Sequence, residues 1–186
     1  MPNPDQDQAA DRLLVVIHGD TAFVRLEGRG SFKISSDMKQ FGAAAIEQKV
    51  RRFVFDMRHC LGMDSTFMGV LAGIAFRLRQ KLSGEMLMVN LSTRTRGLLA
   101  TLGLDQLIRP FMAGSTPADL EGVLGKEPFE VPEYPPPTER QRAETVLEAH
   151  EDLVRAAPGN LPKFKDVITF LRDDLKKTGP GGAAKD

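Results

Sequence analysis

The sequence predicts an α/β fold, in which a mixed β-sheet covered by helices is followed by a C-terminal α-helical hairpin. Three features of the chain support this prediction. Short apolar runs alternate with segments of helical spacing along residues 13–114, prolines are frequent in residues 115–142, and two amphipathic stripes occupy residues 143–177. Alternating strands and helices are typical of a sheet with helices packed against it, and two adjacent amphipathic stripes are typical of paired helices.

The expected order of elements in residues 13–114 is β-β-α-β-α-β-α-β. A β-branched run and an alternating segment flank the turn sequence His18-Gly19-Asp20 and predict an opening hairpin. Ser35, Ser36 and Asp37 are candidate N-caps for the first helix, whose apolar face extends to about Val50. The predicted strands are Leu13–Ile17, Ala22–Glu27, Phe53–Met57, Met86–Leu91 and Ile108–Met112.

The most informative segment is Arg52–Gln80, which has the pattern of a strand, a short connection and an apolar helix. Apolar residues recur at helical intervals from Phe67, so Ser65 is expected at or beside the N-terminus of this helix. Free backbone N–H groups and the helix dipole favour a negative charge there. A hydroxyl at that place either caps the helix or marks a position where a phosphate is tolerated. Asp64 is expected to cap the helix or to orient the neighbouring hydroxyl.

This segment resembles the STAS domain, the fold of bacterial anti-sigma factor antagonists. That family has an apolar strand ending in Asp, then a segment such as Asp-Ser-Ser-Gly-Leu-Gly that opens a helix. The matching residues here are Phe55-Asp56 and Asp64-Ser65-Thr66-Phe67-Met68-Gly69. The order of elements also agrees with the family over about Leu13–Gly114. The resemblance therefore implies a STAS-like mixed sheet, and Phe67, where many members have Gly, is a departure that bears on kinase access.

The resemblance implies a non-catalytic bacterial signalling module of the anti-sigma factor antagonist type. Its partner would be a protein, either an anti-sigma factor or a serine kinase. Regulated members are phosphorylated on the first Ser of the motif, which corresponds to Ser65, and Thr66 is the alternative hydroxyl. A phosphate there would add negative charge to the contact surface and release the partner. The residues that the resemblance implies for partner binding are Asp64, Ser65, Thr66, Phe67, Met68, Arg29, Gly30 and Ser31.

Two alternatives come from other classes of protein. Some STAS domains are cytosolic accessory subunits of membrane transporters for lipids or anions, and genomic neighbours or co-purification would distinguish that role from signalling. A small enzyme with Ser65 as its nucleophile is the weaker alternative, because the sequence shows no His placed to activate the hydroxyl. We therefore expect no catalytic residues and no enzymatic activity.

Composition restricts the remaining classes. Lys and Arg total 25 and Asp and Glu total 25, so the chain lacks the basic excess of a nucleic-acid-binding protein. The single Cys60 excludes an intramolecular disulfide, and it shows no metal-ligand spacing with the three His residues, so neither a metal nor a cofactor is expected. The sequence contains neither a signal peptide nor a run of ~20 apolar residues. These features predict a cytoplasmic protein without membrane insertion.

The expected domain organisation is a disordered N-terminus (residues 1–12), a STAS-like domain (13–114), a Pro-rich linker (115–142), a helical hairpin (143–177) and a flexible tail (178–186). The apolar stripes of the hairpin need a surface to cover them. That surface is the STAS-like domain, a second copy of the chain or a partner helix. The linker favours a homodimer or a partner contact, because its prolines would hold the hairpin away from its own domain.

Overall fold

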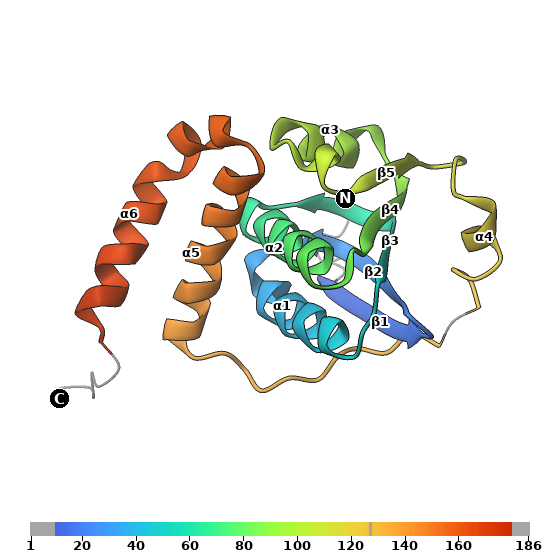
Figure 1. Cartoon of the computed structure of the whole chain (residues 1–186), viewed down its shortest axis with the longest axis horizontal. Coiled ribbons are helices and arrows are strands. Elements are labelled where there is room, and N and C mark those ends of the chain that lie inside the picture. Colours follow the sequence, from blue (N-terminus) through green and yellow to red (C-terminus); the bar gives the residue numbers. More distant parts are fainter. Residues whose placement is uncertain (1–9, 127, 180–186) are drawn as a thin grey trace, which may run out of the picture.

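The computed structural model describes residues 10–126 and 128–179 (Figure 1). The predicted α/β architecture is confirmed, with a mixed sheet, helices packed against it and two C-terminal helices. The strands are β1 (Arg12–His18), β2 (Thr21–Gly30), β3 (Arg52–Met63), β4 (Glu85–Leu91) and β5 (Arg109–Met112). The α-helices are α1 (Phe32–Glu47), α2 (Ser65–Leu82), α3 (Thr93–Thr101), α4 (Ala118–Glu121), α5 (Glu139–Ala156) and α6 (Leu161–Lys177).

The strands lie in the sheet in the order of the sequence, β1-β2-β3-β4-β5. β1 and β2 form the predicted antiparallel hairpin, and its turn contains Gly19 with a φ of 62°. The remaining neighbours are parallel, and each connection between them contains a helix. Because such crossovers are right-handed and all step in one direction, they place α1, α2 and α3 on one face of the sheet (Figure 1).

β3 lies between β2 and β4 and is buried on both faces, which explains its continuous apolar run. Phe53, Phe55 and Met57 pack into the core beneath the helices, whereas Val54 packs into a second cluster with Phe23 from β2. The side chains alternate between the two faces because successive residues of a strand point in opposite directions.

The strands β2 and β3 extend further than the sequence predicts. β3 continues to Met63, and β2 continues to Gly30, so that Arg29 pairs with Gly62 and Gly30 with Met63. The pairing shifts register twice, and Gly28 has a φ of 76°, which explains why these irregular ends look like loops in the sequence. The parallel ends of β2 and β3 bring the Gly28–Ser31 segment directly beside the start of α2.

The predicted Pro-rich linker is more structured than expected. It contains α4, and Glu130 pairs with Val15 of β1 through two backbone hydrogen bonds of 2.8 and 2.9 Å. Leu120 and Leu124 are buried against the face of the sheet opposite α1 and α2. The apolar residues on that face of the sheet are buried because this segment packs over them. The number of prolines in the segment does not predict this contact.

The structure corrects the expectation that the C-terminal hairpin stands away from its own domain. α5 packs along α2, and Ala149 and Leu153 of α5 belong to the same apolar core as the sheet and the other helices. The connector crosses beneath α1 and delivers α5 beside α2 (Figure 1). α6 packs against α5, and Ile168 is its one buried residue in the described part of the chain.

The two predicted flexible ends are described only in part. Residues 1–9 and 180–186 lie outside the described residues. Arg12, which the sequence assigns to the disordered N-terminus, already belongs to β1, and Asp11 binds the end of β2. Within the described residues, every helix is too short or too polar to cross a lipid bilayer.

Candidate functional site

The candidate site lies at the N-terminus of α2, where the sequence predicts it. Ser65 is the first residue of the helix, and Asp64 is its N-cap. The Asp64 carboxylate accepts a hydrogen bond from the Phe67 backbone N–H at 2.8 Å. The structure therefore confirms the predicted capping role of Asp64 and the predicted position of Ser65.

Asp64 also connects α2 to α1. Its second carboxylate oxygen accepts a hydrogen bond from the Phe32 backbone N–H at 2.7 Å, at the first residue of α1. Its own backbone N–H donates to the Gly30 carbonyl at 2.8 Å. One side chain thus holds the first turns of two helices and the end of β2 together, and this role depends on contacts far apart in the sequence.

Three of the residues predicted to bind a partner point into the protein. Thr66, Phe67 and Met68 are buried, and the Phe67 ring is 0% exposed. The ring lies over Gly30, where a Cβ atom would come within 2.5 Å of the ring carbon Cδ1. The ring that replaces the small residue of the STAS motif therefore fills the core beneath the site, and it does not screen Ser65 from a kinase.

The Gly28–Ser31 segment lies at this site, as predicted, but it is held by a residue that the sequence does not single out. Asp11 accepts hydrogen bonds from the Arg29 backbone N–H at 2.9 Å and from the Ser31 hydroxyl at 3.0 Å. The Arg29 side chain is exposed. Arg29 and Ser31 therefore remain candidates for contact with a partner or a phosphate.

Two exposed apolar side chains flank the site and are missing from the sequence prediction. Phe32, at the start of α1, is 61% exposed, and Leu61, near the end of β3, is 63% exposed. Large apolar residues at such exposure on adjoining elements are typical of a protein contact surface. We call Arg29, Ser31, Phe32, Leu61 and Ser65 the mouth surface. The sequence signal for it is weak, because Phe32 and Leu61 are isolated apolar residues among polar and small neighbours, and nothing in the sequence indicates that they lie beside Ser65.

The largest departure from the sequence prediction is a contact between Ser65 and His150 of α5. The Ser65 hydroxyl lies 3.0 Å from Nε2 of His150, and Nδ1 of the same ring lies 2.7 Å from the Val146 carbonyl oxygen. A carbonyl only accepts, so in the neutral ring Nδ1 carries the proton and Nε2 accepts from the Ser65 hydroxyl. His150 is buried and packs against the ring of Phe164 in α6, with the ring centroids 4.9 Å apart.

This pair corrects the premise that no His is placed to activate Ser65. A Ser–His pair is the start of a nucleophilic site, but nucleophilic catalysis also requires room for a substrate and an orienting group on the second nitrogen. Here the Val146 carbonyl does orient the second nitrogen, but His150 is buried against Phe164 of α6, so the ring has no room beside it for a substrate. The geometry suits a contact between two elements better than it suits catalysis. Among the described residues, no three His, Cys, Asp or Glu side chains gather as metal ligands.

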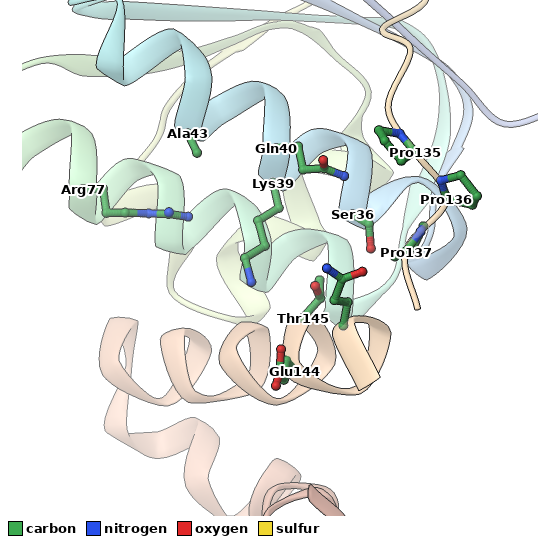
Figure 2. A pocket seen from close by; sticks show the side chains of 11 residues that line it. Ser36, Lys39, Gln40, Ala43, Arg77, Pro135, Pro136, Pro137, Glu144 and Thr145 are labelled. Atoms are coloured by element: carbon green, nitrogen blue, oxygen red, sulfur yellow. The ribbon is translucent and has the colours of Figure 1, made fainter. Parts of the chain in front are cut away.

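A cavity of about 440 Å³ separates part of α5 from the domain. Figure 2 shows Lys39 of α1 extending toward α5, with Arg77 of α2 on one side of the cavity and Pro135–Pro137 on the other. Lys39 is paired with Glu148 of α5 at 2.6 Å. The lining combines polar side chains with three prolines and Ala43, and Ser65 is not part of it. The Lys39–Glu148 pair therefore joins α1 to the middle of α5 beside this space, and Ala149 and Leu153 further along α5 pack into the apolar core.

The α2–α5 contact contains a carboxyl group whose pKa is raised. Burial raises the pKa of Asp152 above 3.8, with smaller raising effects from Glu148 and Glu151 and opposing effects from Arg155 and Arg77. A raised pKa means that the folded chain holds this proton more tightly than the unfolded chain. The contribution of Asp152 to stability is therefore fully present at pH values below its unfolded pKa and is lost as the pH rises through the raised folded pKa.

We expect Asp152→Asn to raise the melting temperature at about pH 7, because the amide removes the burial penalty of a charge. The difference from the parent protein should vanish at about pH 3, where the carboxyl is neutral in both states. Thermal melts at the two pH values test this. Glu151→Gln is the matched control on the same helix, because Glu151 is paired with Arg172 at 2.6 Å and its loss should not stabilise. A lower melting temperature for Asp152→Asn at about pH 7 would contradict the prediction.

Comparisons with known proteins agree with this fold. The STAS domain model matches residues 12–116. The crystal structure of an anti-sigma factor antagonist from Mycobacterium paratuberculosis is 18% identical, with a TM-score of 0.51, and the match covers 64% of this chain and 98% of that chain. The anti-sigma factor antagonist SpoIIAA in its unphosphorylated form is 20% identical, with a TM-score of 0.47 and coverage of 59% and 92%. The phosphorylated form of SpoIIAA from Bacillus is 21% identical, with a TM-score of 0.44 and coverage of 52% and 87%. The comparison with curated proteins finds no match.

Proposed function

The chain belongs to the STAS domain family, and from this premise we propose that it is a protein-binding signalling module of the anti-sigma factor antagonist type. Its partner is an anti-sigma factor or a serine kinase, which binds at the mouth surface. The fold is generally a non-catalytic one, which agrees with this role. A cytoplasmic location and a bacterial source stay predictions of the sequence.

The observation that carries this proposal is the exposure of Phe32 and Leu61 beside Ser65. An apolar side chain that is left in water on a helix end or strand end gains free energy when a partner covers it. Arg29 and Ser31 add polar groups at the same place, and a contact with apolar anchors and a polar surround is typical of protein interfaces. This arrangement supports a protein partner rather than a small substrate.

We propose further that phosphorylation of Ser65 switches this contact, with Thr66 as the less accessible alternative because its side chain is buried. A phosphate on Ser65 would sit at the N-terminus of α2, where the helix dipole stabilises negative charge. The exposed guanidinium of Arg29 is available to pair with it. The added charge would have to be desolvated beside the apolar residues of the mouth surface when the partner binds, and this cost would weaken the complex.

Affinity capture of partners from the native cell tests the binding surface. The double variant Phe32→Ser/Leu61→Ser should lose at least ~90% of the captured partner, because two central apolar anchors commonly contribute more than ~1.4 kcal/mol together. Phe170→Ser is the matched control, since Phe170 is 68% exposed but lies on α6. Equal capture by the double variant and the control would exclude the mouth surface as the contact.

The switch is tested by phosphosite mass spectrometry on the captured protein and by two substitutions. Ser65→Asp should weaken partner binding by at least ~10-fold relative to Ser65→Ala, because only the former adds a charge. Equal affinities would contradict the switch but would not contradict the proposed binding surface.

The captured proteins also separate the classes of function, since a permease with an ATPase would indicate a transporter accessory subunit. Turnover that depends on Ser65 would indicate an enzyme.

A further inference from the structure

The C-terminal hairpin covers the residue that the proposed switch depends on. Ser65 is partly buried, and its hydroxyl is hydrogen-bonded to His150 of α5. Residues 66–75 of α2 are buried all around the helix, which shows that α5 shields a face the sheet does not reach. A kinase or a partner that needs the Ser65 hydroxyl meets α5 first.

α2 and α5 pack so closely that no Cβ atom fits between them at two positions of α2. A Cβ atom added at Gly69 would overlap the backbone carbonyl of Ala149, and one added at Gly73 would overlap the carboxylate of Asp152. The two glycines lie one helical turn apart on the side of α2 that faces α5. α5 therefore cannot shift toward α2, and it makes room at Ser65 only by moving away.

His150 cannot simply turn aside. Its ring is fixed by the Val146 carbonyl on one side and by the Phe164 ring on the other. With Ser65 in the side-chain orientation seen here, a phosphoryl group on its oxygen would compete for the place now occupied by Nε2 of His150. Modification of Ser65 therefore breaks the hydrogen bond that joins it to α5.

The way the hairpin is attached allows it to leave without unfolding the sheet. The segment 131–137 that precedes it has no regular secondary structure. The start of α5 lines the cavity of Figure 2, and the Lys39–Glu148 ion pair, which solvent weakens, joins α1 to the middle of α5. Leu153 is the only large side chain of α5 that is fully buried in the described residues. The α2–α5 contact is as extensive as a strand pairing of the sheet, and Asn160 adds a hydrogen bond to the Leu102 carbonyl. Opening the hairpin alone nevertheless breaks only part of the contacts that global unfolding breaks, so it needs less free energy than global unfolding.

We propose that the α5–α6 hairpin is an autoinhibitory cover, which closes Ser65 and the adjoining face of α2 and must undock before a kinase or a protein partner engages them. This rests on the function proposed above. Because docking and engagement compete, a substitution that favours the open state and leaves the mouth surface unchanged also favours engagement.

Gly69→Ala tests the proposal in the full chain. The new methyl group overlaps the backbone of α5, which has to move, while Ala favours the helical state of α2 itself. Gly73→Ala is the matched control, because it adds the same methyl group one turn later but meets only the Asp152 side chain, which can rotate. Access is measured by the rate at which a Ser65→Cys thiol reacts with a thiol reagent. Cys60 gives little background, since it is buried and burial raises its pKa to about 11.

We expect the Ser65→Cys thiol to react at least ~10-fold faster when Gly69→Ala is present, and within ~2-fold of the parent when Gly73→Ala is present. Hydrogen exchange should show faster exchange along α5 and α6 in Gly69→Ala, with the protection of β2, β3 and β4 unchanged. The proposal is overturned if labelling is equally fast with and without Gly69→Ala. It is also overturned if α5 amides exchange only together with those of the sheet. Neither measurement uses a partner or a kinase, so its failure is distinct from a failure of the proposed function.

Discussion

Replacing Phe67 by Ala is expected to lower the free energy of unfolding by about 3–5 kcal/mol, the range for loss of a fully buried Phe. The ring is 0% exposed and lies over Gly30, where it joins the start of α2 to the end of β2. Its removal leaves a cavity directly beneath the mouth surface. Denaturant unfolding followed by circular dichroism gives the difference. Phe32→Ala is the matched control, since Phe32 is 61% exposed and its truncation should change stability by less than ~1 kcal/mol.

A double-mutant cycle with Gly30 identifies the cause of that loss. A methyl group at Gly30 would come within 2.5 Å of the Phe67 ring, so Gly30→Ala alone is expected to destabilise the protein. In the Phe67→Ala background the same methyl group enters the vacated space, and its cost should fall by about 1 kcal/mol or more. Strict additivity would show that the ring and the glycine are not coupled. It would then leave the departure from the STAS motif at Phe67 without a packing explanation.

The course of the sheet is largely predictable from the sequence, because apolar β-branched runs and turn residues act locally. The runs at residues 13–17 and 53–57 and the Gly19 turn place three strands correctly. The position of Ser65 follows from the change of spacing at Phe67 and from the capping chemistry of Asp64. These features depend on neighbours a few residues away, and such neighbours are visible in the sequence.

The contacts that change the meaning of the site are not local. His150 reaches Ser65 across 85 residues, and nothing in the amphipathic stripe of α5 indicates which surface it covers. The prolines of the connector suggested separation, but Leu120 and Leu124 bind this segment to the sheet. The direction of the Phe67 ring also depends on a glycine in another strand. Each of these outcomes depends on tertiary packing, which residue type and spacing along the sequence do not predict.

Replacing Asp64 by Ala is expected to lower the free energy of unfolding by roughly 2–4 kcal/mol. The substitution removes the cap of α2 and leaves the Phe67 and Phe32 backbone N–H groups without their carboxylate. Losing an N-cap costs about 1 kcal/mol, and losing a hydrogen bond to a charged group costs about 1.5–3 kcal/mol. Denaturant unfolding measures the total. Hydrogen exchange should show the loss concentrated in the first turns of both α1 and α2.

Asp64→Asn separates the two bonds, because an amide has one oxygen to accept with where the carboxylate has two. Its oxygen can accept a hydrogen bond from the backbone N–H of Phe67 or of Phe32, and its NH₂ group then faces the other N–H donor. Asp64→Asn should therefore lower the free energy of unfolding by about half as much as Asp64→Ala or more. If only the first turn of α2 loosened in both variants, Asp64 would be an ordinary helix cap. If the first turns of both α1 and α2 loosen, Asp64 holds Phe32 and Ser65 of the mouth surface in place through its hydrogen bonds to the two helices. A loss of partner binding in these variants would then come from misplacement of Phe32 and Ser65 rather than from a missing contact with the Asp64 carboxylate.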